Sequence, residues 1–407
     1  MFPALRRRSF RFLWLGNLAP QLSNWIQSAA LGWLTLSVTG QPFYLGLVAF
    51  TRGLPAILFA VGSGVLVDRF NRRQILLINQ VVGFLVAATM AFAVITGRAG
   101  VAVLLLFAFL MGTISAVQFP LQQTLLSDLS REEDLVNAVA LNAIGNHGSR
   151  IAGPSIAGLL IQHVHFAAAF AVQAVAYLWG FLCFGRIEAL PRHSGTPDET
   201  SVWRSMRLGW TYVRATPEVA AVIGLAATFF LVGMSFSDLM PYFARERLHA
   251  DAAQFGQLLA AVGWGAFVAS ILLGLTRTVE RKGPVMLVCC AVYGVMLIFL
   301  GLASDFWSAV AALILLGASS ALYFTMNQTL IQMTTPPPLR GRVLGIYFLA
   351  SGSQPLGSLM MGAVAQSFGT TTVFVLAGLV CLASALVVAI AVPALIRPPR
   401  VARRSRV

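Results

Sequence analysis

The sequence predicts an all-α membrane protein with twelve transmembrane helices, arranged as two parallel repeats of six helices each. Three observations support this fold class. Hydrophobic residues make up 58% of the 407 residues and charged residues 10%, whereas soluble domains carry about 25% charged residues. Apolar runs of about 20 residues, long enough to cross a bilayer as helices, recur along the chain. Two stretches half a chain apart also have similar sequences.

The internal repeat is clearest where seven residues recur at an offset of 205 positions, although roughly one identity is expected there by chance. The first copy contains Gly112, Ser115, Ala116, Phe119, Gln123, Thr124 and Leu125, and the second contains Gly317, Ser320, Ala321, Phe324, Gln328, Thr329 and Leu330. Six helices return a chain to the side of the membrane where it began. We therefore expect the second half to repeat the first in the same orientation, with a central site between the halves.

The predicted helices follow from the apolar runs, which are too long for the roughly 10-residue strands of a membrane barrel. They cover roughly 10–38, 43–66, 74–96, 100–127, 135–163, 166–187, 217–244, 250–275, 284–302, 306–333, 342–367 and 370–396.

Four parts of the chain follow from these runs. They are an N-terminal six-helix bundle at 1–187, a cytoplasmic linker at 188–216, a C-terminal six-helix bundle at 217–396 and a basic cytoplasmic tail at 397–407. Within the linker, Trp203, Met206, Trp210 and Val213 recur at helical spacing, which predicts an amphipathic helix on the cytoplasmic membrane surface.

The basic residues predict the orientation of the chain in the membrane. Of the 28 Lys and Arg residues, 23 fall on the same predicted side of the membrane. The exceptions are Arg52, Arg98, Arg150, Arg245 and Arg247. Because basic residues favour the cytoplasmic side, we expect both termini in the cytoplasm of a bacterial inner membrane that the chain crosses many times. The net charge of +14 therefore reflects topology, and we expect the lipid bilayer but no nucleic acid as a partner.

The sequence shows no pattern typical of an enzyme, a metal site or a nucleotide-driven pump. Its four cysteines, Cys183, Cys289, Cys290 and Cys381, all lie in apolar runs, which argues against disulfides and metal ligands. The five histidines form no metalloprotease spacing, and no phosphate-binding loop is present. We expect no catalytic residues, no metal and no cofactor, and a monomer.

The stretch 64–73 resembles the loop after the second helix of major facilitator superfamily transporters. Its matching residues are Gly64, Leu66, Asp68, Arg69, Arg72 and Arg73. Asn71 stands where the family usually has glycine, and asparagine tolerates a left-handed backbone. The resemblance implies the major facilitator fold and a cytoplasmic latch of Gly64, Asp68, Arg69, Arg72 and Arg73, with Asp68 near Arg340. The alternative is that the arginines only fix topology.

A second motif, Gly153-Pro154 followed by Gly158, resembles the antiporter motif found mainly in exporters of this superfamily. The alternative is plain packing of small residues against a neighbouring helix. Three stretches, 30–34, 52–55 and 239–246, look like the bacterial branch that includes the enterobactin exporter. These resemblances imply efflux rather than uptake.

Ionisable groups inside the predicted helices mark a polar cavity, since each costs about 2.5–3.5 kcal/mol to insert. We predict a substrate cavity formed by Asn24, Gln27, Arg52, Gln118, Gln122, Asn146, Arg150, Tyr323, Asn327 and Gln354. Its two arginines favour anionic or hydrogen-bond-rich small molecules over hydrophobic cations. The alternative is that Arg150 caps carbonyls freed by Pro154 and that Arg52 pairs with a neighbour structurally.

Proton coupling needs a group that changes protonation during transport, and Asp238 and His147 are the candidates. The sequence thus favours a secondary-active transporter for proton-coupled efflux of a siderophore-like or drug-like molecule by alternating access. A proton-coupled uptake symporter is the first alternative. A non-transporting membrane sensor or scaffold is the alternative from another class.

Overall fold

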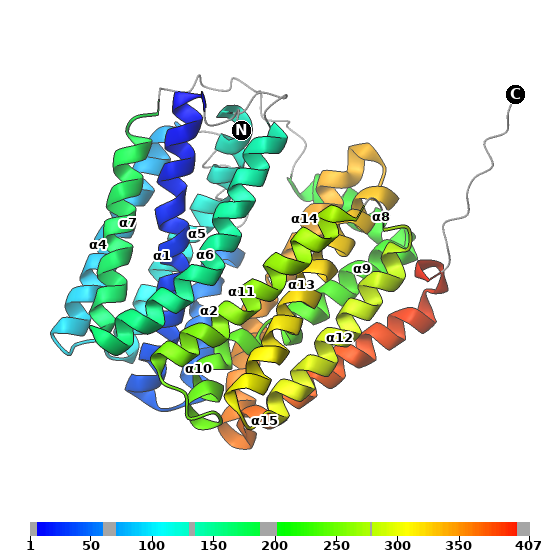
Figure 1. Ribbon diagram of the computed structural model, residues 1–407. Helices are drawn as coiled ribbons and strands as arrows, with labels where there is room; N and C mark the ends of the chain where they lie inside the picture. Colours follow the sequence, from blue (N-terminus) through cyan, green and yellow to red (C-terminus); the bar gives the residue numbers. More distant parts are fainter. Residues whose placement is uncertain (1–5, 60–70, 130–134, 188–201, 277–278, 397–407) are drawn as a thin grey trace, which may run out of the picture.

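The computed structural model describes residues 6–59, 71–129, 135–187, 202–276 and 279–396 (Figure 1). Within these residues the regular secondary structure is helical and contains no strand, which confirms the predicted all-α class. Eight described helices are long and apolar enough to cross a bilayer, and the shorter Pro42–Leu58 is apolar too. The helices form two groups, which we call the first and second halves (Figure 1).

The first half is built around one central helix, which packs on two neighbours. In chain order its helices are α1 (Arg8–Thr39), α2 (Pro42–Leu58), α4 (Arg72–Ile95), α5 (Val101–Leu129), α6 (Leu135–His163) and α7 (Phe166–Phe184). Helix α1 packs on α6 and α7, α4 packs on α7, and α2 packs on α5.

The second half contains longer helices and several breaks. Its helices are α9 (Pro217–Thr228), the π-helical turn η3 (Phe229–Gly233), α10 (Phe236–Glu246), α11 (Ala252–Leu275), α12 (Lys282–Leu302), α13 (Phe306–Thr334), α14 (Arg340–Ser351) and α15 (Gln354–Ala391), with short 3-10 turns η4 (Pro337–Leu339) and η5 (Pro393–Leu395). Helix α11 packs on α13, and α12 packs on both α13 and α15.

The structure corrects the predicted helices at two places. The single helix expected at 217–244 is interrupted by η3. The helix expected at 342–367 is two helices, because it breaks at Gly352 and Ser353, where Pro355 has no N–H to continue the ladder. The backbone turns again at Gly369, between the helices expected at 342–367 and 370–396, and its φ of 77° suits glycine. Helix α2 ends at Leu58, and the rest of the expected 43–66 is largely outside the described residues.

Helix starts are fixed by short polar side chains. Asn71 has an extended backbone rather than the expected left-handed one, and its side chain caps α4 by accepting from the Arg73 and Gln74 amides. Asp251 and Gln254 form a capping box at the start of α11.

The predicted amphipathic helix is present as α8 (Val202–Ala215). It packs on α14 and α9, and the Tyr212 hydroxyl donates to the Thr334 carbonyl at 2.7 Å. Leu208 and Trp210 remain exposed on its outer side. Helix α8 is therefore attached to the second half, and its place on a membrane surface stays a prediction.

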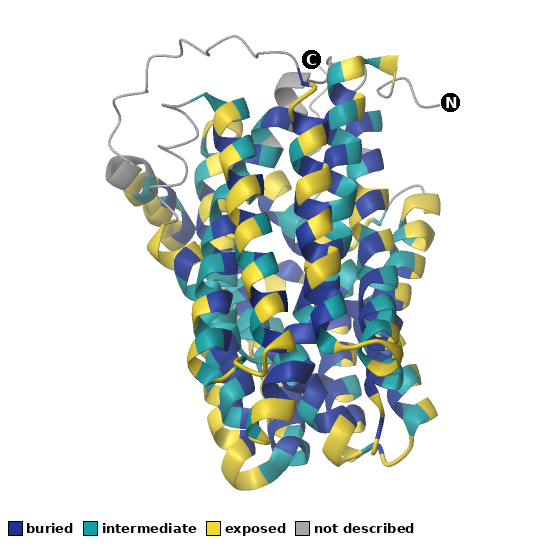
Figure 2. Cartoon of the chain, turned by 90° about the vertical axis from the view of Figure 1, so that its left-hand side faces the viewer, coloured by how far each residue is buried: buried dark blue, intermediate teal, exposed yellow. Residues whose placement is uncertain are grey.

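Large apolar side chains cover the outward faces of the helices, where Figure 2 shows alternating exposed and buried residues. Phe92 is 63% exposed, Leu275 76% and Phe368 68%. Such a surface suits a hydrocarbon solvent rather than water.

The two halves meet closely at one end of the molecule, opposite the end where α1 begins (Figure 1). We call this the distal end. There α6 packs on α11 and α2 packs on α15. A side chain at Gly158 would collide with the Ala252 carbonyl, and one at Gly46 with the Ser358 carbonyl. Glycine therefore permits backbone contact between the halves at both helix crossings.

Candidate functional site

A cavity of about 310 Å³ lies where the two halves meet, at the lower end of the size range of small-molecule pockets. Helices α1, α2 and α6 line it from the first half, and α10, α11, α12, α13 and α15 line it from the second. Its charged lining residues, among those described, are Arg52, Arg150 and Asp238. The structure thus brings together three of the ionisable residues that the sequence places inside predicted helices, but not His147.

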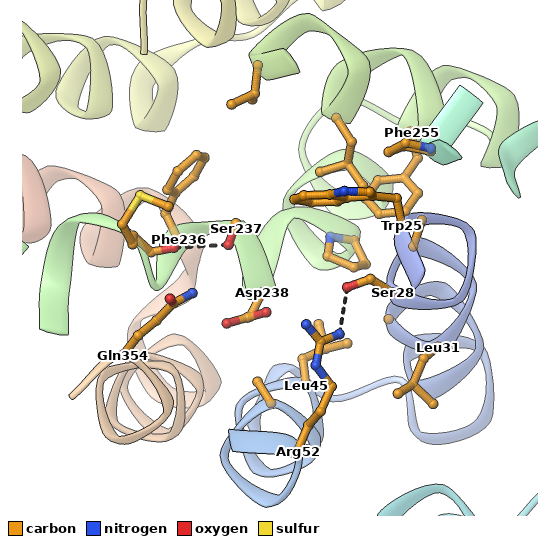
Figure 3. A pocket seen from close by; sticks show the side chains of 18 of the residues that line it. Trp25, Ser28, Leu31, Leu45, Arg52, Phe236, Ser237, Asp238, Phe255 and Gln354 are labelled. Carbon is orange, nitrogen blue, oxygen red and sulfur yellow. Dashed lines mark hydrogen bonds between the residues drawn. The ribbon is translucent and has the colours of Figure 1, made fainter. Parts of the chain in front are cut away.

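Arg52 reaches the cavity from α2, three residues before Pro55, which lies inside that helix. Its Nη1 atom donates to the Ser28 hydroxyl of α1 at 2.7 Å (Figure 3). The other guanidinium N–H groups have no hydrogen-bond partner among the described residues. They remain available to a ligand in the cavity.

Asp238 lies opposite Arg52, on α10 of the second half (Figure 3). The Ser358 hydroxyl of α15 donates to its Oδ2 atom at 2.6 Å. Gln354, one helical turn before Ser358, lines the same wall. The Asp238 side chain is half-buried, and no second hydrogen bond to it comes from the described residues.

Arg150 enters the cavity from α6 and lies over the ring of Trp25, with the guanidinium carbon 5.5 Å from the ring centroid. This distance suits a cation–π interaction. The described residues provide neither a carboxylate partner nor a carbonyl acceptor for its side chain. The alternative in which Arg150 caps carbonyls freed by Pro154 therefore has no hydrogen bond to support it.

Aromatic rings form much of the remaining wall. Trp25, Phe236, Phe255 and Tyr293 line the cavity, and Phe255 stacks on Trp33 at 4.9 Å between centroids. Because Trp33 belongs to α1 and Phe255 to α11, this stack joins the halves. The arrangement offers two cationic groups and flat apolar surfaces, which together suit an anion that carries a ring or an apolar body.

Several predicted cavity residues do not line this cavity, because their amides pair inside the first half. Gln27 accepts from Gln173 at 3.0 Å. Gln118 accepts from Asn79 at 3.3 Å, and Gln122 donates to Asn17 at 2.9 Å. Polar residues of membrane helices commonly bond to neighbouring helices in this way.

The other predicted cavity residues also lie outside the lining. Tyr323 and Asn327 are buried within the second half, where the Tyr323 ring stacks on Phe229 at 4.2 Å and Asn327 donates to the Tyr323 carbonyl. Asn24 and Asn146 are exposed away from the lining. His147 is half-buried and within electrostatic range of Arg150 but does not line the cavity either.

The proposed antiporter motif lies at the contact between the halves. A side chain at Gly153 would collide with Trp25, Pro154 lines the cavity, and the Pro154 carbonyl faces Gly256 of α11. Gly158 meets the first turn of the same helix. The motif therefore both shapes the cavity wall and allows α6 to approach α11.

The predicted latch is only partly described. Gly64, Asp68 and Arg69 lie outside the described residues. Arg73 donates to the Gly185 carbonyl at 2.7 Å, which joins the start of α4 to the end of α7 within the first half. Arg72 also has an interaction, and Arg340 donates to the Thr335 carbonyl.

Sequence reasoning missed the residues that hold the charges in place. Ser28, Ser358 and Trp25 contact the three ionisable groups. Serine and tryptophan are ordinary residues of membrane helices, so composition gives no signal for them. Only Ser358 has a weak sequence signal, because it follows the predicted cavity residue Gln354 by one helical turn.

Residues 1–398 match the family described as transmembrane secretion effectors, MFS_3. The chain belongs to this family. This confirms the resemblance to major facilitator transporters. The matched proteins are membrane transporters, so the chain is not an enzyme.

Curated relatives of this MFS_3 protein carry transport functions in their names. A staphyloferrin A transporter of Staphylococcus aureus is 27% identical, covering 88% of this chain and 90% of the relative. The multidrug efflux pump Tap of Mycolicibacterium fortuitum is 28% identical, with 86% and 88% covered. Macrolide efflux protein A of Streptococcus pyogenes is 21% identical, with 92% and 94% covered.

Solved transporter structures have the same fold. A POT family transporter in complex with 5-aminolevulinic acid superposes with a TM-score of 0.76 at 12% identity, covering 96% of this chain and 97% of that one. A bacterial homologue of the lysosomal transporter Spinster, in an inward-facing and unoccupied conformation, gives a TM-score of 0.71 at 14% identity, with 97% of each chain covered. At such low identity these structures show the fold alone.

Proposed function

We propose that this MFS_3 protein is a secondary-active exporter that moves a small anionic or polar molecule outward by alternating access, in exchange for protons. The observation that carries the proposal is the position of Arg52 and Arg150 in a cavity between two packed halves of a transporter fold. Relatives named as efflux pumps support export.

The proposed architecture is twelve membrane-spanning helices in two parallel repeats. Equivalent contacts in the two halves support it: α2 packs on α5 as α11 packs on α13, and α4 packs on α7 as α12 packs on α15. On this proposal, α9 with α10 forms the seventh span, and α14 and α15 contribute the last two. Both termini then lie in the cytoplasm of the inner membrane, and the monomer is sufficient for transport.

The substrate proposal follows from the charges in the cavity. Two guanidinium groups face one carboxylate, so the cavity carries a net positive charge in either protonation state of Asp238. Uncompensated cations at partly buried positions attract anions strongly. Siderophore-like or drug-like anions with a ring or an apolar body fit the aromatic walls.

We propose that the described conformation is open toward the cytoplasm. Contacts between the halves lie at the distal end, where α6 meets α11 and α2 meets α15. If the end at which α1 begins is cytoplasmic, substrate enters from that side and leaves after the distal contacts separate.

We propose Asp238 as the proton-coupling group, with His147 as the second candidate. Asp238 lines the cavity and faces Arg52, so its charge directly alters the binding site. His147 acts on the cavity only through the nearby Arg150. The latch of Gly64, Asp68, Arg69, Arg72 and Arg73 remains a proposal for the cytoplasmic end.

Transport by purified protein in proteoliposomes tests this function. We would compare benzenesulfonate with phenyltrimethylammonium, which share a ring, carry opposite permanent charges and do not cross lipid by protonation. The proposal expects benzenesulfonate flux driven by a pH gradient, with little flux of the cation. Cation transport without anion transport would contradict the substrate class, and flux unaffected by the pH gradient would contradict proton coupling.

Neutralising the two candidates separates their roles. Asp238→Asn should leave exchange of benzenesulfonate across the membrane but remove its dependence on a pH gradient, because that side chain no longer takes up a proton. His147→Gln should retain the dependence. If the double variant still responds fully to the gradient, neither residue couples transport to protons. Uptake in whole cells that exceeds export would favour the symporter alternative.

A further inference from the structure

Arg52 and Asp238 face each other across the cavity without forming an ion pair (Figure 3). Asp238 lies within electrostatic range of Arg52. Nevertheless, no side-chain nitrogen of Arg52 approaches a carboxylate oxygen of Asp238 within 4.0 Å. Opposite charges in a partly buried site attract more strongly than in water, so this separation needs a physical cause.

Each charge is held by a serine of its own half. The Ser28 hydroxyl of α1 accepts from Arg52 on the neighbouring helix α2. The Ser358 hydroxyl of α15 donates to Asp238 on α10. Hydrogen bonds to charged groups are stronger than neutral ones, and their strength is comparable to the attraction between half-exposed opposite charges. Two such bonds are therefore enough to keep the pair open.

The distance between Arg52 and Asp238 matters for transport because the two residues belong to opposite halves. Arg52 belongs to the first half and Asp238 to the second, and both lie beside the distal contacts of α2 with α15. If the pair closed, an ion pair would bridge the halves. It would also occupy the guanidinium and the carboxylate oxygen that otherwise face a ligand.

We propose that Ser28 and Ser358 are positioning residues that keep Arg52 and Asp238 apart, so that both charges remain available to the transported molecule. The inference rests on the proposed transport function and adds two residues to it. Without either serine, the freed charge turns toward its opposite and closes the pair. Transport then slows, because substrate loses a binding group and the halves gain a bond that must break in each cycle.

The first test is structural and needs no substrate. We would determine structures of the wild-type protein and of Ser28→Ala in lipid nanodiscs by cryo-electron microscopy. We expect an Arg52–Asp238 ion pair within 4.0 Å in the variant and an open pair in the wild type. An Arg52 side chain that stays in place without Ser28, or a closed pair in the wild type, would overturn the inference.

The second test measures exchange of benzenesulfonate between the two sides of proteoliposome membranes. We expect Ser28→Ala and Ser358→Ala to lower the initial rate about tenfold and to raise KM, whereas Ser28→Thr, which keeps the hydroxyl, stays within about twofold of wild type. In an Asp238→Asn background, Ser28→Ala should change the rate less than about twofold, since no carboxylate remains to capture Arg52.

Comparing Ser28→Ala in the wild-type and Asp238→Asn backgrounds tells whether Ser28 positions Arg52 or only packs between helices. A serine that only packs α1 against α2 would cause the same loss in both backgrounds, which would overturn the inference. If Asp238→Asn abolishes exchange, benzenesulfonate binding measured by calorimetry replaces the rate in all variants. A wild-type protein that neither binds nor exchanges benzenesulfonate contradicts the proposed substrate class, and the structural test then decides the inference alone.

Discussion

At the residue scale, two arginines among the described residues each lie over a tryptophan ring but in different surroundings. The Arg150 guanidinium carbon is 5.5 Å from the Trp25 centroid in the cavity, and that of Arg214 is 5.2 Å from Trp210 on α8. The stacking geometry is similar, so only the cavity distinguishes them. This makes Arg214 a matched control for the role of Arg150.

We predict that Arg150→Ala lowers benzenesulfonate transport at least about tenfold, because one charged hydrogen bond contributes about 1.5–3 kcal/mol. Arg150→Lys should recover part of the rate, since it keeps the charge but not the planar fork. Arg214→Ala should transport normally. Proteoliposome assays with protein quantified after reconstitution measure this, and equal losses in Arg150→Ala and Arg214→Ala would argue against a binding role for Arg150.

The charged cavity residues were predictable from sequence, whereas most of the neutral ones were not. Arg52, Arg150 and Asp238 stand out because charges are rare in apolar runs. Gln27 and Gln122 look equally suitable, yet they bond to amides of neighbouring helices. A polar residue inside a membrane helix serves a cavity or a helix contact, and only the packing of helices decides which.

At the element scale, a residue of the first half caps a helix of the second half at the distal end. The Gln162 side chain at the end of α6 donates to Asp251 Oδ2 at 3.1 Å and accepts from the Ala253 amide at 3.0 Å. Helix α11 thereby receives one cap from its own Asp251 and another from across the interface. The second cap exists only while the halves are packed together at this end.

We predict that Gln162→Ala weakens the distal contact by about 1 kcal/mol, the usual contribution of a cap, and shifts the protein toward a state open at that end. Spin labels on the exposed Val164 and Trp307 positions would report the shift as a longer distance in pulsed electron resonance. The native cysteines are buried, which limits unwanted labelling.

Gln254→Ala is the matched control for this prediction. It removes a capping-box bond within α11 but no bond between the halves. The distance distribution should therefore match that of the wild type. A longer distance in Gln254→Ala as well would attribute the shift to fraying of α11 rather than to the lost contact with α6.

Hydropathy located most helices but not their interruptions. The break before α15 has a local signal in Gly352, Ser353 and Pro355, which a hydropathy average over 342–367 does not register. The π-helical turn η3 lies in the apolar stretch Phe229–Gly233 and depends on tertiary contacts. Ser235 donates to the Leu231 and Gln354 carbonyls, and Tyr293 donates to the Gly233 carbonyl, which satisfies backbone groups that the π-helical turn frees.

At the scale of the whole molecule, the sequence repeat predicted two related halves with a site between them, and the cavity lies between two helix groups. The repeat could not show at which end the halves touch. That depends on small differences between interfaces, here the glycine crossings of α6 with α11 and α2 with α15. The sequence of an alternating-access transporter must allow contact between the halves at either end. Its residue pattern alone therefore does not tell which of the two conformations is adopted.

We predict that linking the halves at the distal end stops transport. A flexible thiol reagent joining Gln162→Cys to Asp251→Cys should reduce benzenesulfonate flux to the level of empty liposomes, because the distal end can no longer open. A reducible reagent should restore flux after reduction. Single-cysteine variants treated with the same reagent should keep their flux, and full flux through the linked protein would contradict alternating access.

Helix α8 packs on α14 and α9 and is bonded to the end of α13 by Tyr212. An antibody fragment that recognises its outer side would therefore mark the second half alone. Such a fragment would serve as a rigid fiducial for imaging a small particle, and it would report the tilt of one half relative to the other without restraining either.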